Sequence, residues 1–358
     1  MIYLDNNTTT QTASSVFDAM KPYFDSASDT DAKAVETARE GIAGLIGAAR
    51  TDEIVFTRSG TESNYFAILG AIGSLHRNHI ITTKVEHRSI LTLCERQETQ
   101  GLRVSWLDVD EDGVLDIDGI RSALNKDTAV VSIMLAHNET GILFPVEQLA
   151  EIIKANSDAL FHVDGACAMG KIPINLKETE IDLFSMSGHK FYGPNSVGAL
   201  YIRNGVNIKV SETKTVPENV GIGAAAEFVK DLSPMTAIGE MRERLENAIL
   251  KNIPNVYVNG TGDAANRLPN TSNISFENTN GEAIMARLEA AGVIVSTSSA
   301  CSSQDHKASA VLQAMNIPYV QAMGAVTFSL GRSNTFGEVD KVIEILPGLV
   351  CELRSLGK

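Results

Sequence analysis

Residues 160–190 decide the fold, because two short apolar runs in this stretch, LFHV at 160–163 and IDLFS at 181–185, each lead into polar residues. The first run is followed by Asp164 and the second by Ser187-Gly188-His189-Lys190. Apolar, β-branched runs that alternate with longer helical patterns are typical of parallel strands joined by crossovers. The stretch therefore predicts one unit of a parallel α/β sheet, with polar side chains at the carboxyl ends of its strands.

The same alternation continues on both sides of this stretch and predicts a large domain. Five further apolar runs occupy residues 53–57, 79–83, 103–107, 130–135 and 197–202. Together they give a seven-stranded, mainly parallel sheet flanked by helices. Upstream, apolar residues recur at helical spacing between Ala34 and Ile46, which predicts an amphipathic helix packed on the sheet.

After Gly205 the pattern changes to that of a smaller α+β domain. It predicts helices near 237–251 and 337–355, and strands near 256–258, 273–276, 293–296 and 325–330. We expect a large domain over residues 15–205 and a small domain made of residues 1–14 and 206–358. The polar stretch 203–220 is the expected connection between them.

Composition and charge limit the partners, the location and the kinds of site that we expect. The 358 residues include 44 acidic and 30 basic side chains, a formal net charge of −14 that repels nucleic acid and anionic lipid. We therefore expect neither as a partner. The chain has no secretory leader pattern and no apolar stretch long enough to span a membrane, so a cytoplasmic location is expected. Its four cysteines lack CxxC spacing, which predicts neither a metal site nor a disulfide framework.

The polar residues at the strand ends predict a cofactor site. The turn at 59–63 opens a helix, whose amide groups can hold a phosphate. Asp164 can pair with a protonated ring nitrogen, Lys190 can form an imine with an aldehyde, and His87 offers an aromatic face. Together these features describe a pyridoxal phosphate site. Taken singly, each has a structural alternative: a helix cap for the turn or for Asp164, and a surface position for Lys190.

These residues resemble those of the cysteine desulfurases, which belong to the class V aminotransferase group of fold-type I pyridoxal phosphate enzymes. The resemblance covers most of the chain. Its motifs are YLDNNTT (3–9), VFT (55–57), GTESN (60–64), EH (86–87), NETG (138–141), HVD (162–164), SGHKFYGP (187–194), SAC (299–301) and FSLGR (328–332).

The resemblance implies a role for each site residue. Lys190 would carry the cofactor as an imine and act as base, Asp164 would bind the pyridine nitrogen, and His87 would stack on the ring. The phosphate would be held by Gly60, Thr61, Ser187 and His189. Asn138 and Arg332 would bind the substrate amino acid, Arg332 as a bidentate clamp on its carboxylate.

Cys301 would be the sulfur carrier of such an enzyme. It lies in a run of small hydroxylated residues, which predicts an exposed loop rather than a core position. A thiol must lose its proton to act as a nucleophile, and His306 and Lys307 are nearby candidates to assist. Cys94 and Cys351 lie in predicted helices and are expected to be buried.

Three features depart from the family pattern, all near the cofactor. Cys167 stands where the family usually has a glutamine that bonds the cofactor's phenolic oxygen. The family's Gly-Asn-Pro-Ser-Ser and His loop, expected between Phe24 and Val35, is absent. The Gly-rich segment that contacts phosphate from the partner subunit is reduced to residues 209–215. Arg58 could replace the lost positive charge; the alternative is an ordinary surface arginine.

The sequence thus predicts a pyridoxal phosphate-dependent cysteine desulfurase that converts L-cysteine to L-alanine and holds the sulfur as a persulfide on Cys301. We expect a homodimer that passes sulfur to an iron–sulfur scaffold or another thiolation acceptor. The alternatives are a selenocysteine lyase, a class V aminotransferase, or a catalytically impaired homologue that acts as a binding partner in sulfur transfer.

Overall fold

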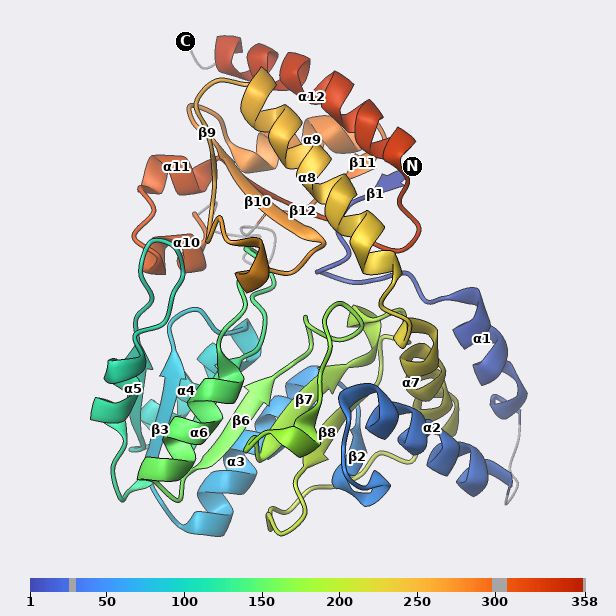
Figure 1. Ribbon diagram of the computed structural model, residues 1–358, viewed down its shortest axis with the longest axis vertical. Helices are drawn as coiled ribbons and strands as arrows, with labels where there is room; N and C mark the ends of the chain where they lie inside the picture. The colour runs from blue at the N-terminus through green and yellow to red at the C-terminus, as the bar shows by residue number, and fades with distance from the viewer. Residues whose placement is uncertain (26–29, 298–307, 357–358) are drawn as a thin grey trace.

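The computed structural model describes residues 1–25, 30–297 and 308–356 and contains two packed units (Figure 1). The unit drawn in the lower half is built on a seven-stranded sheet, and the one in the upper half on a three-stranded sheet. None of the helices in the described ranges is long and apolar enough to cross a membrane.

The seven-stranded sheet is mainly parallel, as predicted. Its strands, in spatial order, are β2 (Ile54–Thr57), β8 (Gly198–Ile202), β7 (Leu183–Ser187), β6 (Leu160–Asp164), β5 (Thr128–Met134), β3 (His79–Thr83) and β4 (Arg103–Leu107). Only β8 runs against its neighbours. The central strands β3, β5, β6 and β7 are almost wholly buried, which explains why they read as continuous apolar runs.

Helices cover both faces of this sheet (Figure 1). They are α3 (Gly60–Leu75) and α4 (Arg88–Thr99) behind it in this view, and α5 (Ile117–Ala123) and α6 (Val146–Asn156) in front. The predicted helix upstream is α2 (Thr30–Ile46), which buries Ile42 and Ile46 in the large core. α1 (Ser14–Met20) projects at the side of the molecule.

Helix α7 (Val216–Val229) packs on α2 and α1. Its buried residues Ile222 and Val229 belong to the core of the large sheet, so α7 is part of that unit although it follows residue 205, the boundary expected from sequence. The crossing with α2 is close: a β-carbon on Gly223 would overlap Ala38. After α7 the chain returns to the small core with Leu232 and Met235.

The small unit is a three-stranded antiparallel sheet in the order β12 (Ala325–Ser329), β10 (Thr271–Phe276) and β9 (Val256–Val258). The helices α8 (Pro234–Asn252), α9 (Gly281–Ala290) and α12 (Phe336–Leu356) pack with it. The N-terminal strand β1 (Ile2–Tyr3) pairs with β11 (Val293–Ile294), so the first residues join this unit. The short helices α10 (Ala310–Ala314) and α11 (Tyr319–Met323) lie toward the large unit.

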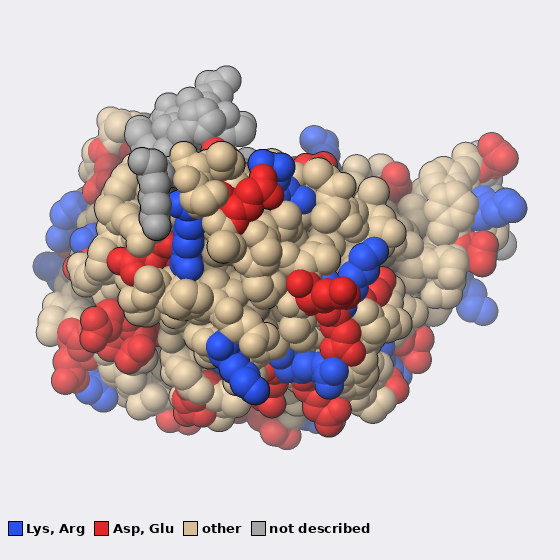
Figure 2. Space-filling model, turned by 90° about the horizontal axis from the view of Figure 1, so that it is seen from above, with Lys and Arg blue, Asp and Glu red and all other residues tan. Residues whose placement is uncertain are grey.

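On the face seen from above, basic and acidic side chains are interspersed (Figure 2). Arg244 on α8 pairs with Asp340 on α12, and Arg287 on α9 pairs with Glu352 on α12. These exposed ion pairs connect α12 to α8 and α9, and each contributes little to stability.

The two structural predictions for cysteines have different outcomes. Cys94 is buried between α4 and the sheet, as expected. Cys351 is exposed, so the expectation that it is buried was wrong. Val350, its neighbour on α12, faces the small core, and one residue further along a helix turns the side chain by about 100° toward solvent.

Candidate active site

The polar residues that follow the parallel strands lie at one edge of the large sheet, beneath the small unit. Asp164 ends β6, Lys190 ends the 3₁₀ turn after β7, and His87 caps α4 after β3. Hydrogen bonds through Asn64 and Ser89 connect Asp164 to His87, and the charges of Asp164 and Lys190 both act on the pKa of His87. Burial, the largest influence, lowers that pKa and keeps the ring neutral.

Asp164 is a buried carboxylate with two donors. Asn64 on α3 donates from Nδ2 to its Oδ2 at 2.8 Å, and the main-chain N–H of Ala166 donates to its Oδ1 at 3.0 Å. The side chain is 7% exposed. The two donors fix the orientation of the carboxylate, as binding of a protonated ring nitrogen requires.

The start of α3 is built to approach the end of β7. A β-carbon on Gly60 would lie 2.8 Å from the Ser187 Cβ, so only glycine lets the helix start this close to the strand. The Ser59 hydroxyl accepts the N–H of Glu62, which leaves the first amides of the helix for an anion. Thr61 and Arg58 are exposed beside them.

Lys190 is held by the N-terminal segment. Its Nζ donates to the carbonyls of Asn7 at 2.6 Å and Thr8 at 2.9 Å. Next to it, His189 Nδ1 lies 3.1 Å from the Thr9 hydroxyl, and burial lowers the pKa of His189 to about 4. A neutral imidazole beside the lysine can donate a hydrogen bond without adding charge.

The guanidinium of Arg332, predicted to be a bidentate clamp on the substrate carboxylate, binds main-chain carbonyls in this structure. Its Nη1 donates to the carbonyl of Phe228, and its Nη2 donates to those of Val229 and Asp231, at the end of α7. Both terminal nitrogens are thus engaged because the carbonyls after a helix end have no partners in the helix. Nε remains buried without a partner among the described residues.

Asn138 is tied to the same edge through its main chain, because its carbonyl accepts from Asn7 Nδ2 at 3.0 Å. The next residue, Glu139, contacts Ser309, which follows residues 298–307, and Thr327 on β12, the partner of Ser296. Its carboxylate accepts from the Ser309 hydroxyl at 2.7 Å, and its carbonyl accepts from Thr327, which pairs with Ser296. Cys301, His306 and Lys307 themselves lie outside the described residues.

Cys167, which replaces the family's glutamine, is buried in a small apolar cluster. Its carbonyl accepts from the Nζ of Lys171 at 2.7 Å. Lys171 is also buried, and burial lowers its pKa to about 8. The sequence analysis gave no role to Lys171, to the N-terminal Asn7 or to Glu86 of the EH motif, which is buried and whose pKa burial raises to about 8.

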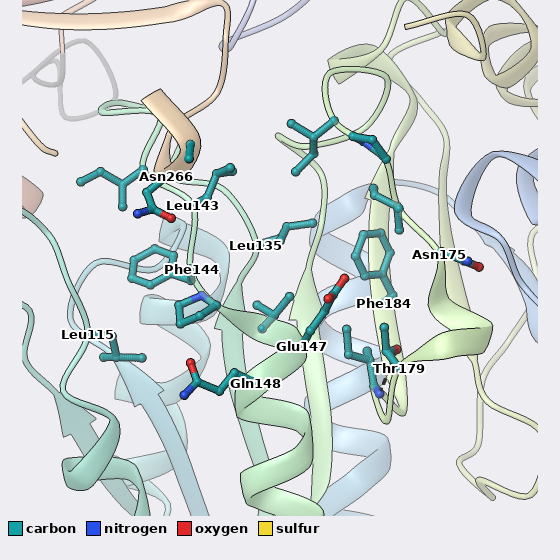
Figure 3. A pocket seen from close by; sticks show the side chains of 18 of the residues that line it. Leu115, Leu135, Leu143, Phe144, Glu147, Gln148, Asn175, Thr179, Phe184 and Asn266 are labelled. Atoms are coloured by element: carbon teal, nitrogen blue, oxygen red, sulfur yellow. Dashed lines mark hydrogen bonds between the residues drawn. The ribbon is translucent and has the colours of Figure 1, made fainter. Parts of the chain in front are cut away.

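A cavity of about 650 Å³ lies beside this edge, between the start of α6 and the loop after β6 (Figure 3). Its wall is mainly apolar and includes Leu135, Leu143, Phe144 and Phe184. None of the described residues predicted for cofactor or substrate lines it. It is therefore distinct from the candidate active site.

Comparison with known proteins identifies the family. The sequence-family model for class V aminotransferases matches residues 2–214 and 208–342 of this chain. A cysteine desulfurase of Gluconacetobacter diazotrophicus is 43% identical over 381 residues, covering 99% of this chain and 94% of the relative. That alignment is longer than the chain itself, so the relative has residues that this chain lacks. The chain belongs to the class V aminotransferases and, within them, to the cysteine desulfurase family.

Solved structures agree with this assignment. A NifS-like protein superposes with a TM-score of 0.90 at 31% identity, over 98% of this chain and 100% of its own. The protein SspA, solved in complex with cysteine, gives a TM-score of 0.80 at 27% identity, over 94% of this chain and 100% of its own. The predicted fold is thereby confirmed.

Proposed function

We propose that this chain is a pyridoxal phosphate-dependent cysteine desulfurase, which converts L-cysteine to L-alanine and carries the sulfur on Cys301. The observation that carries the proposal is the convergence of Asp164, Lys190 and His87 at one sheet edge, beside the free amides at the start of α3. The family's name and the SspA complex with cysteine support the choice of substrate.

The donor set fits pyridoxal phosphate. Asp164 presents an oriented carboxylate for the ring nitrogen, and Lys190 presents an amine for the aldehyde. The phosphate would be held by the amides of Gly60 and Thr61, together with Ser187, His189 and Arg58. When bound, the cofactor supplies an electron sink that makes the substrate Cα–H acidic and allows the Cβ–S bond to break.

Side chains of this chain would accept the substrate's Cα proton and bind its carboxylate. Lys190, once free of the cofactor, is the base that takes the Cα proton, and the carbonyls of Asn7 and Thr8 keep its amine at the site. Arg332 would bind the substrate carboxylate through Nε–H, the donor that the structure leaves buried and unpartnered. Asn138 would complete the substrate pocket.

Cys301 accepts the sulfur. Its thiolate attacks the substrate sulfur, the new S–S bond takes the thiolate electron pair, and the Cβ–S pair remains on carbon, which is protonated to give alanine. The product on the protein is a persulfide. Glu139, next to Asn138, accepts a hydrogen bond from Ser309, which follows residues 298–307, and one from Thr327, which pairs with Ser296 on the preceding side.

We propose further that the enzyme is a cytoplasmic homodimer that passes the persulfide sulfur to an iron–sulfur scaffold or another thiolation acceptor. The exposed Phe17 and Phe24 at the projecting end of the large unit support a second copy as partner, since large apolar side chains at a protruding edge favour an interface.

The test is incubation of the purified protein with L-cysteine and a thiol reductant, with alanine and sulfide measured together. Equal yields that are abolished in Lys190→Ala and in Cys301→Ser support the proposal. Sulfide release that persists in Cys301→Ser contradicts the persulfide step and favours lyase chemistry. Protein that stays colourless after addition of pyridoxal phosphate contradicts the enzyme function altogether.

A further inference from the structure

Two buried side chains outside the predicted site connect its aspartate to its histidine. Asn64 on α3, 2% exposed, donates from Nδ2 to Asp164 Oδ2 at 2.8 Å and to the Ser89 hydroxyl at 3.0 Å. Ser89 in turn contacts His87 Nδ1 twice: its hydroxyl at 2.8 Å and its main-chain N–H at 3.2 Å. These contacts form a continuous chain from Asp164 through Asn64 and Ser89 to His87.

The direction of each hydrogen bond follows from chemistry. An ionised Asp164 can only accept, so Asn64 must turn its amide nitrogen toward it. The Ser89 oxygen accepts from that same nitrogen, which leaves the hydroxyl hydrogen to donate to His87 Nδ1. The Ser89 N–H also donates there. His87 Nδ1 is therefore an acceptor, and the ring proton lies on Nε2, the nitrogen farther from Ser89.

We propose that Asn64 and Ser89 are positioning residues that fix the Nε2–H tautomer of His87 and the orientation of Asp164 together. Asn64 is the branch point, because one amide group serves both acceptors. The tautomer belongs to the protein alone, whereas the benefit to cofactor binding rests on the proposed function. Neutral His87, whose pKa is lowered by burial, is the form that this arrangement requires.

The tautomer is tested on apoprotein carrying ¹⁵N-labelled histidine, with the His87 signal assigned by its loss in His87→Gln. We expect nitrogen shifts of an Nε2–H ring in the wild type. In Ser89→Ala the Nε2–H to Nδ1–H ratio should fall about fivefold, as expected for loss of one neutral hydrogen bond. Ser89→Thr, which keeps the hydroxyl, should restore it. An unchanged ratio in Ser89→Ala, or no recovery in Ser89→Thr, overturns the proposal.

The branch point is tested with Asn64→Leu, which keeps the volume and removes both donors. It should lower the tautomer ratio as Ser89→Ala does and also weaken pyridoxal phosphate binding about tenfold, the loss expected for one hydrogen bond to a charged group. Ser63→Ala, on the same helix, removes bonds to the Thr57 hydroxyl and to the carbonyls of Ser59 and Ala199, none of which belongs to the Asp164–His87 chain, and should leave both readouts unchanged. If only one readout moves in Asn64→Leu, the coupling is refuted.

The two proposals fail separately. Wild-type protein with the Nε2–H tautomer and the Ser89→Ala shift, but without pyridoxal phosphate binding, would contradict the proposed function and leave the positioning of His87 standing. Active enzyme whose His87 tautomer does not respond to Ser89→Ala would contradict the positioning alone. Should Asn64→Leu not fold, the Ser89 pair of variants still decides the tautomer.

Discussion

Asp164→Asn should weaken cofactor binding by more than its effect on stability explains. The substitution keeps the shape of the side chain but replaces one of its two acceptor oxygens with an amide nitrogen, so that Asn64 and the Ala166 N–H are left with one acceptor oxygen, and it removes the negative charge. What is lost is one charge-assisted hydrogen bond to a protonated ring nitrogen, about 1.5–3 kcal/mol. At 1.36 kcal/mol per factor of ten, the dissociation constant should rise roughly 10- to 150-fold.

The chain offers a matched control in Asp182. This carboxylate is as buried, 1% exposed, but lies at the opposite end of the sheet, where it accepts from the Phe161 N–H at 2.8 Å and from Lys154 Nζ at 3.0 Å. Asp182→Asn should therefore lower the free energy of unfolding by about 1–3 kcal/mol and leave cofactor affinity unchanged.

The assay is titration of each apoprotein with pyridoxal phosphate, followed by absorbance of the lysine-bound cofactor, beside urea unfolding of the same samples. If Asp164→Asn binds within about threefold of the wild type, less than even the weakest charge-assisted bond would allow, Asp164 does not hold the ring nitrogen. Equal losses of affinity in Asp164→Asn and Asp182→Asn would also refute the reasoning, because both would then act through stability.

Three further outcomes follow from single residues. Arg58→Ala should weaken cofactor binding about fivefold and the exposed Arg96→Ala should not, by the same titration, if Arg58 replaces the lost phosphate contacts. Between about pH 4.5 and 8 the folded chain keeps a proton on Glu86 that the unfolded chain has lost. Wild-type stability should therefore fall with rising pH relative to Glu86→Gln, by at most about 1.4 kcal/mol per pH unit; a constant difference in urea midpoints would contradict this. Gly223→Ala should cost about 1–3 kcal/mol at the tight helix crossing, whereas Gly44→Ala, in open space on α2, should gain up to ~1 kcal/mol; thermal unfolding of both variants checks this.

The large sheet could be predicted because its strands are buried on both faces and therefore read as unbroken apolar runs. Helix α7 could not be assigned to it in the same way. Its sequence, VPENVGIGAAAEFV, is rich in glycine and alanine, and the small residues are there because α2 passes so close. A helix that packs closely through glycine and alanine lacks the polar stripe of a surface helix. The sequence pattern therefore predicts the domain boundary before α7 rather than after it.

In the candidate site, too, some residues could be predicted from the sequence and others could not. Residues that directly follow strands could be predicted, because strand direction alone brings them to one edge. Asn64 lies in the second turn of α3 and Ser89 in the first turn of α4, and their alignment with Asp164 and His87 depends on how those helices pack. The engagement of Arg332 depends on where α7 ends, since three main-chain carbonyls near that end bind its guanidinium.

The N-terminal segment connects the large unit, the small unit and Lys190 through hydrogen bonds of Asn7. Asn7 donates from Nδ2 to the Asn138 carbonyl in the large unit and to the Thr271 hydroxyl in the small one, while its own carbonyl accepts from Lys190. Its N–H donates to the Ser329 hydroxyl on β12. Because one buried residue bonds both units and the lysine, a change in their relative position must move the Lys190 amine. The placement of the reactive lysine is thus a property of the assembled units, which neither unit's sequence pattern contains.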